Sequence, residues 1–216
     1  HLAGAIFAFA AVCYLIMNSI FGAAYQNCLF APGGNGNMIL LLIGFMGAGW
    51  MANKFAFSNT SRGLQYFGLG LYVVAEAMII LPLLWVAQYV AVSKGMEANA
   101  PISQAGVITL ILFGGLTATV FVTKKDFSFT GKALSLAMWA AIGTIAAGWL
   151  FGFSLGLWFS AIMLVVAGGY VLYSTSAVMA HFPPSHYVGA ALALFSAVAL
   201  MFFYVLRIII ALQGRD

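Results

Sequence analysis

Polar residues inside long apolar stretches are the positions where this sequence could do chemistry. Glu76 lies in the middle of LYVVAEAMIILPLL (71–84). A charged carboxylate at the centre of a bilayer costs about 2.5–3.5 kcal/mol on insertion scales, so it must be protonated, paired or turned toward internal water. Glu76 is therefore either a proton- or cation-sensing group or a neutral carboxyl that hydrogen-bonds to a neighbouring helix. Pro82 frees a backbone carbonyl nearby, and the two could form a polar pocket.

A second polar feature is a run of hydroxyl side chains in GGYVLYSTSAVMAH (168–181), made up of Tyr173, Ser174, Thr175 and Ser176. Hydroxyls in a membrane helix commonly hydrogen-bond across to a neighbouring helix and so strengthen packing. The alternative is that the hydroxyls line a working site. The residues by themselves leave both interpretations open.

The sequence lacks the residues that several other membrane chemistries need. His1, His181 and His186 lie at the terminus or in a break between apolar runs, so no helix offers a haem ligand or a base for a serine nucleophile. The last apolar run carries Arg207 but no Lys for a retinal Schiff base. No Cys or His spacing suits a metal, and no glycine fingerprint follows a strand. We therefore expect no catalytic residue, no metal and no cofactor.

The composition identifies the solvent of the chain as lipid. Hydrophobic residues make up 64% of the 216 residues and charged residues 6%, whereas soluble domains carry about 25% charged residues. The formal net charge is +4, but no basic stretch interleaves with aromatic residues as in nucleic-acid-binding proteins. A lipid bilayer is thus the expected partner, and nucleic acid is not.

Apolar runs separated by charged, Gly-, Asn-, Pro- or Ser-rich breaks predict an all-α membrane protein with seven transmembrane helices. The weakest break is GFSLG (152–156), which divides a long uncharged stretch that is too long for one crossing. We expect one integral membrane domain, residues 1–216. Its predicted helices are 2–26, 38–57, 64–92, 104–123, 133–153, 157–180 and 187–212.

The charges between the predicted helices are distributed unequally. Alternate breaks carry Lys54, Arg62, Lys124, Lys125 and Lys132 on one side, and only Lys94 and Arg215 on the other. Basic residues are enriched in cytoplasmic loops. The pattern predicts a cytoplasmic amino terminus and a carboxyl terminus on the outer side.

The segment FVTKKDFSFTGKAL (121–134) resembles the T-K/R-K/R-D-F/M-S-F-x-G signature of the Bax inhibitor-1 family. LYSTSAVM (172–179) and YVGAALALFSAVALMFFYVLRII (187–209) are similar to its sixth and seventh helices, and the likeness is clear from about residue 103 onward. The resemblance implies that the chain folds as a seven-helix bundle of Bax inhibitor-1 type. It also implies that the chain is a bacterial-type member of the family and lies in the bacterial inner membrane. The matching signature residues are Thr123, Lys124, Lys125, Asp126, Phe127, Ser128, Phe129 and Gly131.

The resemblance also implies a role for the hydroxyl run. In family members that leak calcium, the sixth and seventh helices each supply an aspartate, and the pair shares protons as a pH-sensitive gate. Ser174 and Ser196 occupy these two positions here. Neither can ionise, and calcium prefers several oxygen ligands that include carboxylates. The two serines therefore argue against a calcium leak, whereas Glu76 is an acid that leaves the leak as an alternative.

Two functions follow as expectations. The first is an integral membrane regulatory or accessory protein that associates with another membrane complex, for example a quality-control protease. The resemblance implies this because a bacterial branch of the family binds such a protease and shares the ending Arg215–Asp216. The alternative is a pH-sensitive leak for calcium or other cations, in which calcium or protons would be the ligands.

Overall fold

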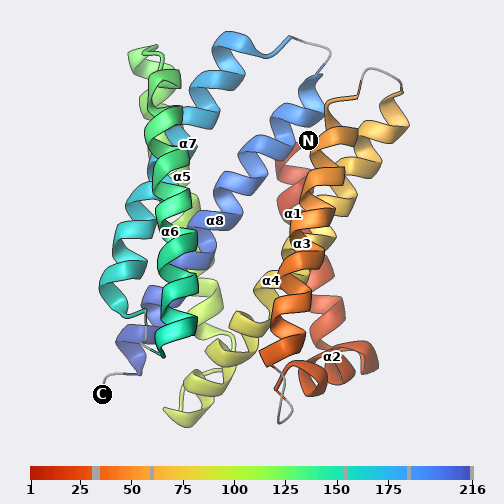
Figure 1. The fold of residues 1–216 in the computed structure, drawn as a ribbon, viewed down its shortest axis with the longest axis vertical. Coiled ribbons are helices and arrows are strands. Elements are labelled where there is room, and N and C mark those ends of the chain that lie inside the picture. Colours follow the sequence, from red (N-terminus) through yellow and green to blue (C-terminus); the bar gives the residue numbers. More distant parts are fainter. Residues whose placement is uncertain (31–34, 59–60, 153–154, 184–185, 215–216) are drawn as a thin grey trace. The chain divides into compact units, whose positions relative to one another are not determined.

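The computed structural model describes residues 1–30, 35–58, 61–152, 155–183 and 186–214, and Arg215 and Asp216 lie outside these residues. In the described residues every regular element is helical (Figure 1). A short 3-10 turn, η1 (Ser128–Thr130), precedes the sixth α-helix. The α-helices are α1 (Leu2–Met17), α2 (Ile20–Phe30), α3 (Asn35–Ala56), α4 (Arg62–Ser93), α5 (Ala100–Thr123), α6 (Gly131–Phe151), α7 (Leu157–His181) and α8 (Tyr187–Gln213).

The lengths and apolar composition of these helices fit a membrane protein, as the composition predicts. Among the described residues, five helices (α4 to α8) are long and apolar enough to cross a bilayer. The pair α1 and α2 passes the same criterion only if it is counted as one span bent by 79°. The described apolar stretch of α3, Leu40–Ala56, is shorter.

The prediction of one helix over residues 2–26 is wrong, because the chain bends sharply after Met17. The Ser19 hydroxyl donates to the Ile16 carbonyl at 2.9 Å and accepts from the Gly22 N–H at 3.0 Å. Such local side-chain bonds compete with the helical ladder. A Cβ at Gly22 would collide with the Ile16 carbonyl oxygen, so the tight approach at this bend needs glycine.

The chain divides into two compact units. Unit one comprises His1–Trp85 and Pro183–Phe195, and unit two comprises Val86–Phe182 and Ser196–Asp216. Helices α4 and α8 each contribute one part to either unit.

Unit one is held together by close helix approach and by aromatic packing. Gly68 of α4 lies against the backbone of α3, where an added Cβ would come within 2.8 Å of the Ala52 carbonyl oxygen. Small residues allow this approach, which replaces the missing hydrophobic drive between helices in lipid. The Phe195 ring lies 5.8 Å from Phe9 and 6.1 Å from Tyr72.

Unit two is built around α7, which packs against both α5 and α6. Gly168 faces the Leu116 side chain of α5, and Gly169 faces the Leu134 side chain of α6. Gly152 ends α6 with a positive φ of 72°, at the predicted break 152–156, of which 153–154 lie outside the described residues. The Arg207 guanidinium of α8 donates to the Leu155 carbonyl at 2.9 Å, which ties α8 to the segment before α7.

Candidate functional site

The signature segment forms the connection between α5 and α6 in unit two. Helix α5 ends at Thr123, whose hydroxyl donates to the Thr119 carbonyl at 2.7 Å. Lys124 then adopts a left-handed conformation with φ 51°, and its N–H bonds to the Val120 carbonyl at 2.9 Å. A left-handed conformation is uncommon outside glycine. It turns the chain sharply and places the next residues beside α7.

The connection is fastened to the hydroxyl run of α7. The Phe127 N–H donates to the Ser176 hydroxyl at 3.2 Å, and that hydroxyl donates in turn to the Tyr173 carbonyl at 3.0 Å. Ser176 is buried. At least one member of the hydroxyl run therefore holds the signature segment in place, a function that the sequence did not reveal.

The end of the signature makes a second attachment to α7. The Thr130 hydroxyl donates to the Phe127 carbonyl at 2.6 Å and closes the η1 turn. A Cβ at Gly131 would lie 2.8 Å from Cε2 of the Tyr173 ring, so the absence of a side chain lets that ring lie against the start of α6. Thr130 was not predicted as a site residue, and Tyr173 was a candidate only as a member of the hydroxyl run. Thr130 bonds a backbone atom, and Tyr173 contacts a residue that is remote in sequence; a sequence motif indicates neither kind of contact.

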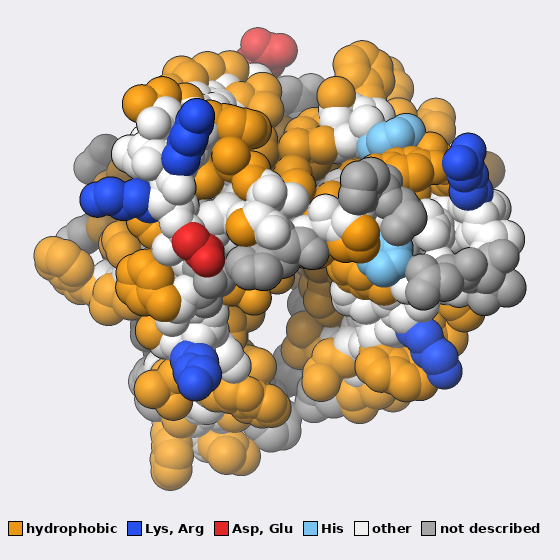
Figure 2. All heavy atoms as spheres, turned by 90° about the horizontal axis from the view of Figure 1, so that it is seen from above, with side chains coloured by type: hydrophobic (Ala, Val, Ile, Leu, Met, Phe, Trp, Pro, Cys, Tyr) orange, Lys and Arg blue, Asp and Glu red, His pale blue; other side chains and the backbone are white. Residues whose placement is uncertain are grey.

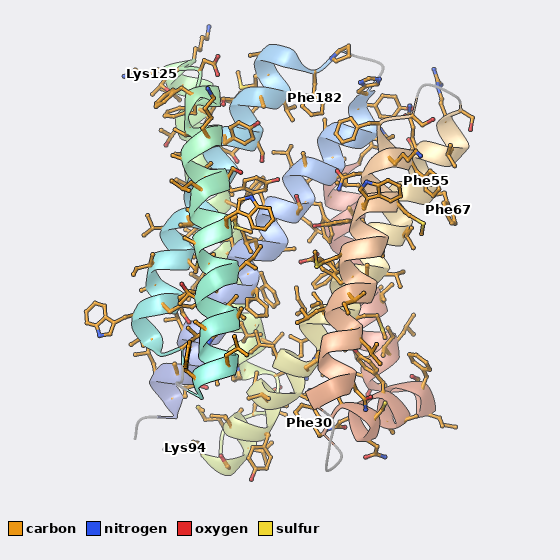
Figure 3. All side chains as sticks on the ribbon, in the orientation of Figure 1. Phe30, Phe55, Phe67, Lys94, Lys125 and Phe182 are labelled. Carbon is orange, nitrogen blue, oxygen red and sulfur yellow. The ribbon has the colours of Figure 1, made fainter. Side chains whose placement is uncertain are left out.

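The signature segment, the end of α5 and the end of α7 enclose a hollow of about 200 Å³, which we call the loop-end pocket. Lys124, Lys125 and Asp126 are exposed at its rim. Figure 3 shows Lys125 at this end of α5, and Figure 2 looks down on the same end. The pocket is lined by Val120, Lys124, Lys125, Asp126, Ser176, Met179 and Ala180.

Not every signature residue that the structure describes lines the pocket. Phe129 is 76% exposed. Ser128 begins the η1 turn, and its side chain lies outside the described part of the structure. Among the signature residues whose side chains the structure describes, Phe127 and Gly131 fasten the connection to α7, and Lys124, Lys125 and Asp126 line the pocket. Thr123 and Phe129 do neither.

Ser174 and Ser196, the positions of the family's paired acids, both belong to unit two. Ser174 is buried on α7, and Ser196 is half-buried on α8. The neighbouring Thr175 is also buried, and its hydroxyl oxygen has no hydrogen-bond partner among the described residues. That Ser174 and Ser196 form a pair stays a prediction.

Glu76 lies inside unit one with 7% of its surface exposed. The Tyr72 side chain, one helical turn earlier, hydrogen-bonds to its carboxyl group. The second carboxyl oxygen, Oε2, has no partner among the described residues. The carbonyl that Pro82 frees belongs to Met78, and it accepts a hydrogen bond from the Tyr25 hydroxyl. A polar pocket formed by Glu76 and this carbonyl stays a prediction.

Among the described residues, no group of three or more His, Cys, Asp or Glu side chains could hold a metal ion. Cys13 is buried and Cys28 is exposed, and both are free thiols.

Comparison with protein families identifies the lineage of the chain. The family model described as "Inhibitor of apoptosis-promoting Bax1" matches residues 1–215. The chain belongs to the Bax inhibitor-1 family. The match confirms the resemblance seen in the signature, and it extends over the amino-terminal half as well. Its family and its several long apolar helices are those of a multi-pass membrane protein.

Individual relatives of the Bax inhibitor-1 family differ in how much of the chain they match. An uncharacterized protein of Pseudomonas aeruginosa is 28% identical over 182 residues, which cover 83% of this chain and 77% of that protein. Protein lifeguard 4 of Mus musculus is 29% identical over 120 residues, 52% of this chain and 48% of that one. Bax inhibitor 1 of Schizosaccharomyces pombe is 30% identical over 120 residues, 53% and 44% of the two chains. The last two matches thus span about half of each relative.

Proposed function

We propose that this Bax inhibitor-1 family member is a non-catalytic regulatory or accessory protein that associates with another integral membrane complex, such as a quality-control protease. The observation that supports the proposal is a face of small residues on α6: Ala140, Gly143, Thr144 and Ala147. Ala140, Gly143 and Thr144 are exposed, and a Cβ added at Gly143 would meet nothing within 4 Å.

This face has the chemistry that packs helices together in lipid. Positions three and four residues apart lie on the same side of a helix, and small side chains there let a second helix approach closely. Only 11% of the apolar stretch Gly131–Gly148 is buried within this chain, against 50% for the windows of α4 and α8. A transmembrane helix of another protein could therefore pack on α6 without displacing a helix of this chain.

Substitution of the face tests the proposal. We expect Gly143→Leu to reduce the amount of partner that copurifies from native membranes in mild detergent by about tenfold or more, because a bulky side chain separates the two helices. Gly70→Leu on α4 is the matched control, because Gly70 is exposed and a Cβ added there meets nothing within 4 Å. The residues three and four positions from it on the helix are not small; they are Tyr66, Phe67, Val73 and Val74. Reciprocal purification and quantitative mass spectrometry identify the partner. A chain that purifies alone in every mild detergent contradicts the proposal.

A pH-sensitive cation leak is the second candidate function, and Glu76 favours it. A buried carboxyl group with one oxygen left without a partner could exchange a proton or meet a passing cation. Calcium flux into liposomes as a function of pH tests this candidate. Calcium flux that exceeds the flux into empty vesicles and is lost in Glu76→Gln supports a leak that depends on Glu76. If Glu76→Gln gives the same flux as the unchanged protein, Glu76 takes no part in the leak.

We further propose seven crossings in a bacterial inner membrane, with the amino terminus in the cytoplasm. Lys94 and Lys125 lie at opposite ends of unit two, as expected for loops on opposite sides of a membrane (Figure 3). In a cysteine-free background, Lys94→Cys should react with a membrane-impermeant maleimide in intact spheroplasts, and Lys125→Cys only after lysis. The reverse order contradicts the orientation.

A further inference from the structure

The loop-end pocket combines a basic rim with an apolar wall at the end of two membrane helices. We propose that it binds the phosphate headgroup of an anionic phospholipid. Two exposed basic residues, Lys124 and Lys125, line the pocket together with the apolar Val120, Met179 and Ala180. This site is separate from the small-residue face of α6 and does not depend on the association proposed above.

The depth of the pocket matches the level of lipid headgroups. The apolar spans Ala100–Thr123 and Leu157–Ala180 each contain 24 residues. At about 1.5 Å per residue such a helix is about 36 Å long, which exceeds the hydrocarbon core of about 30 Å. The ends of α5 and α7 therefore reach the headgroup region, and the pocket lies between these ends.

The charges around the pocket favour an anion over a cation. Lys124 adopts the left-handed conformation at the end of α5, and Lys125 adds a second positive charge to the connection. Lys132 adds a third in the first turn of α6. Figure 2 shows Lys and Arg side chains gathered around an acidic side chain at this end of unit two. Within the described part of the chain, Asp126 is the only carboxylate that lines the pocket. One carboxylate does not make a calcium site, which needs several oxygen ligands, whereas basic pockets between membrane helices suit lipid phosphates.

The apolar wall distinguishes a lipid from a free phosphate ion. Val120 is 1% exposed and forms the base on α5, while Met179 of α7 is 46% exposed at the opening. The glycerol and first acyl carbons of a phospholipid would cover such apolar surface, and inorganic phosphate would not. Ser176 already bonds Phe127 and Tyr173, so its hydroxyl fixes the shape of the pocket.

Lipid binding to the purified full chain tests the inference. Native mass spectrometry and fluorescence binding would compare phosphatidylglycerol with phosphatidylcholine in nanodiscs. We expect preferential retention of phosphatidylglycerol, and the double variant Lys124→Gln/Lys125→Gln should bind it about thirtyfold more weakly at low ionic strength. Ala180→Phe leaves every charge in place and fills the pocket, and should weaken binding by about tenfold.

The controls separate the pocket from general surface charge. Lys54→Gln/Arg62→Gln removes the same charge from the last turn of α3 and the first residue of α4, which are predicted to lie on the same side of the membrane, and should leave the affinity unchanged. Inorganic phosphate at millimolar concentration should not displace the lipid. The inference is overturned if the two lipids bind equally, if the control pair weakens binding as much as the pocket pair, or if inorganic phosphate competes.

Discussion

The Tyr25 hydroxyl donates a hydrogen bond to the Met78 carbonyl oxygen at a distance of 2.9 Å. Pro82 stands four residues after Met78 and has no N–H, so it leaves that carbonyl without its helical donor. Tyr25 replaces the missing donor and thereby joins α2, which follows the bend, to α4 within unit one. Its ring also lies 5.7 Å from Trp85. In a bilayer, where no water satisfies a free carbonyl, this side chain compensates for proline.

Removal of the Tyr25 hydroxyl should therefore destabilise the protein only while Pro82 is present. We expect Tyr25→Phe to lower the free energy of unfolding by about 1 kcal/mol, within the range measured for hydrogen bonds between membrane helices. In a Pro82→Ala background the backbone N–H of residue 82 returns to the Met78 carbonyl, and the same change should cost close to nothing. Denaturation of the four variants in detergent gives this double-mutant cycle. Equal costs in both backgrounds would contradict the compensation.

The bond between Phe127 and Ser176 makes a second prediction. Ser176→Ala removes the acceptor for the Phe127 N–H, so we expect hydrogen exchange at residues 124–130 to become about five- to tenfold faster, the effect of roughly 1 kcal/mol. Ser135→Ala, an exposed serine on α6, is the matched control and should leave this exchange unchanged. Exchange measured by mass spectrometry decides the point. Unaltered protection in Ser176→Ala would show that the connection is held by other contacts.

The long helices were predictable from hydropathy, whereas the bend was not. The predicted segment 157–180 and the observed α7 (Leu157–His181) agree closely, because a glycine-containing break (152–156) and a proline-containing break (181–186) bound the apolar run. No such break separates α1 from α2. The bend there depends on the Ser19 hydroxyl, which bonds the backbone on both sides of it, and on the absence of a side chain at Gly22. One serine and one glycine have little effect on the average hydropathy of residues 2–26, so the hydropathy of this segment does not indicate the bend.

The candidate site was predictable in its position but not in its contacts. The signature identified residues 123–131, and the structure places them in one connection beside α7. The attachment of Phe127 to Ser176 joins residues that are far apart in sequence, and one partner is a backbone N–H. A residue's type says nothing about where its backbone group will bond. The contact therefore required the packing of α7 against the connection, which only the folded chain defines.

Close packing at Gly131 makes a third prediction, about stability. Gly131→Ala would place a Cβ 2.8 Å from the Tyr173 ring, too close for the ring to stay in place. We expect a loss of about 1–3 kcal/mol, the usual cost of overpacking. Gly106→Ala is the control, because a Cβ there meets nothing within 4 Å, and alanine should stabilise that helical position slightly. Thermal unfolding of both variants in detergent compares them, and equal melting temperatures would contradict close packing at Gly131.

Restoration of the family's paired acids provides the last prediction. If Ser174 and Ser196 face each other as the paired acids of the family do, the double variant Ser174→Asp/Ser196→Asp holds two carboxyl groups close together. Two such groups cannot both ionise freely, so they share a proton over part of the pH range. We expect this variant to give a calcium leak in liposomes that depends on pH, with either single variant giving less. The isosteric Ser174→Asn/Ser196→Asn variant keeps the size of the side chains but cannot ionise, and it should show no dependence on pH. Absence of flux at every pH from a folded Asp variant would mean that these two positions no longer border an ion path, which in turn favours association over conduction.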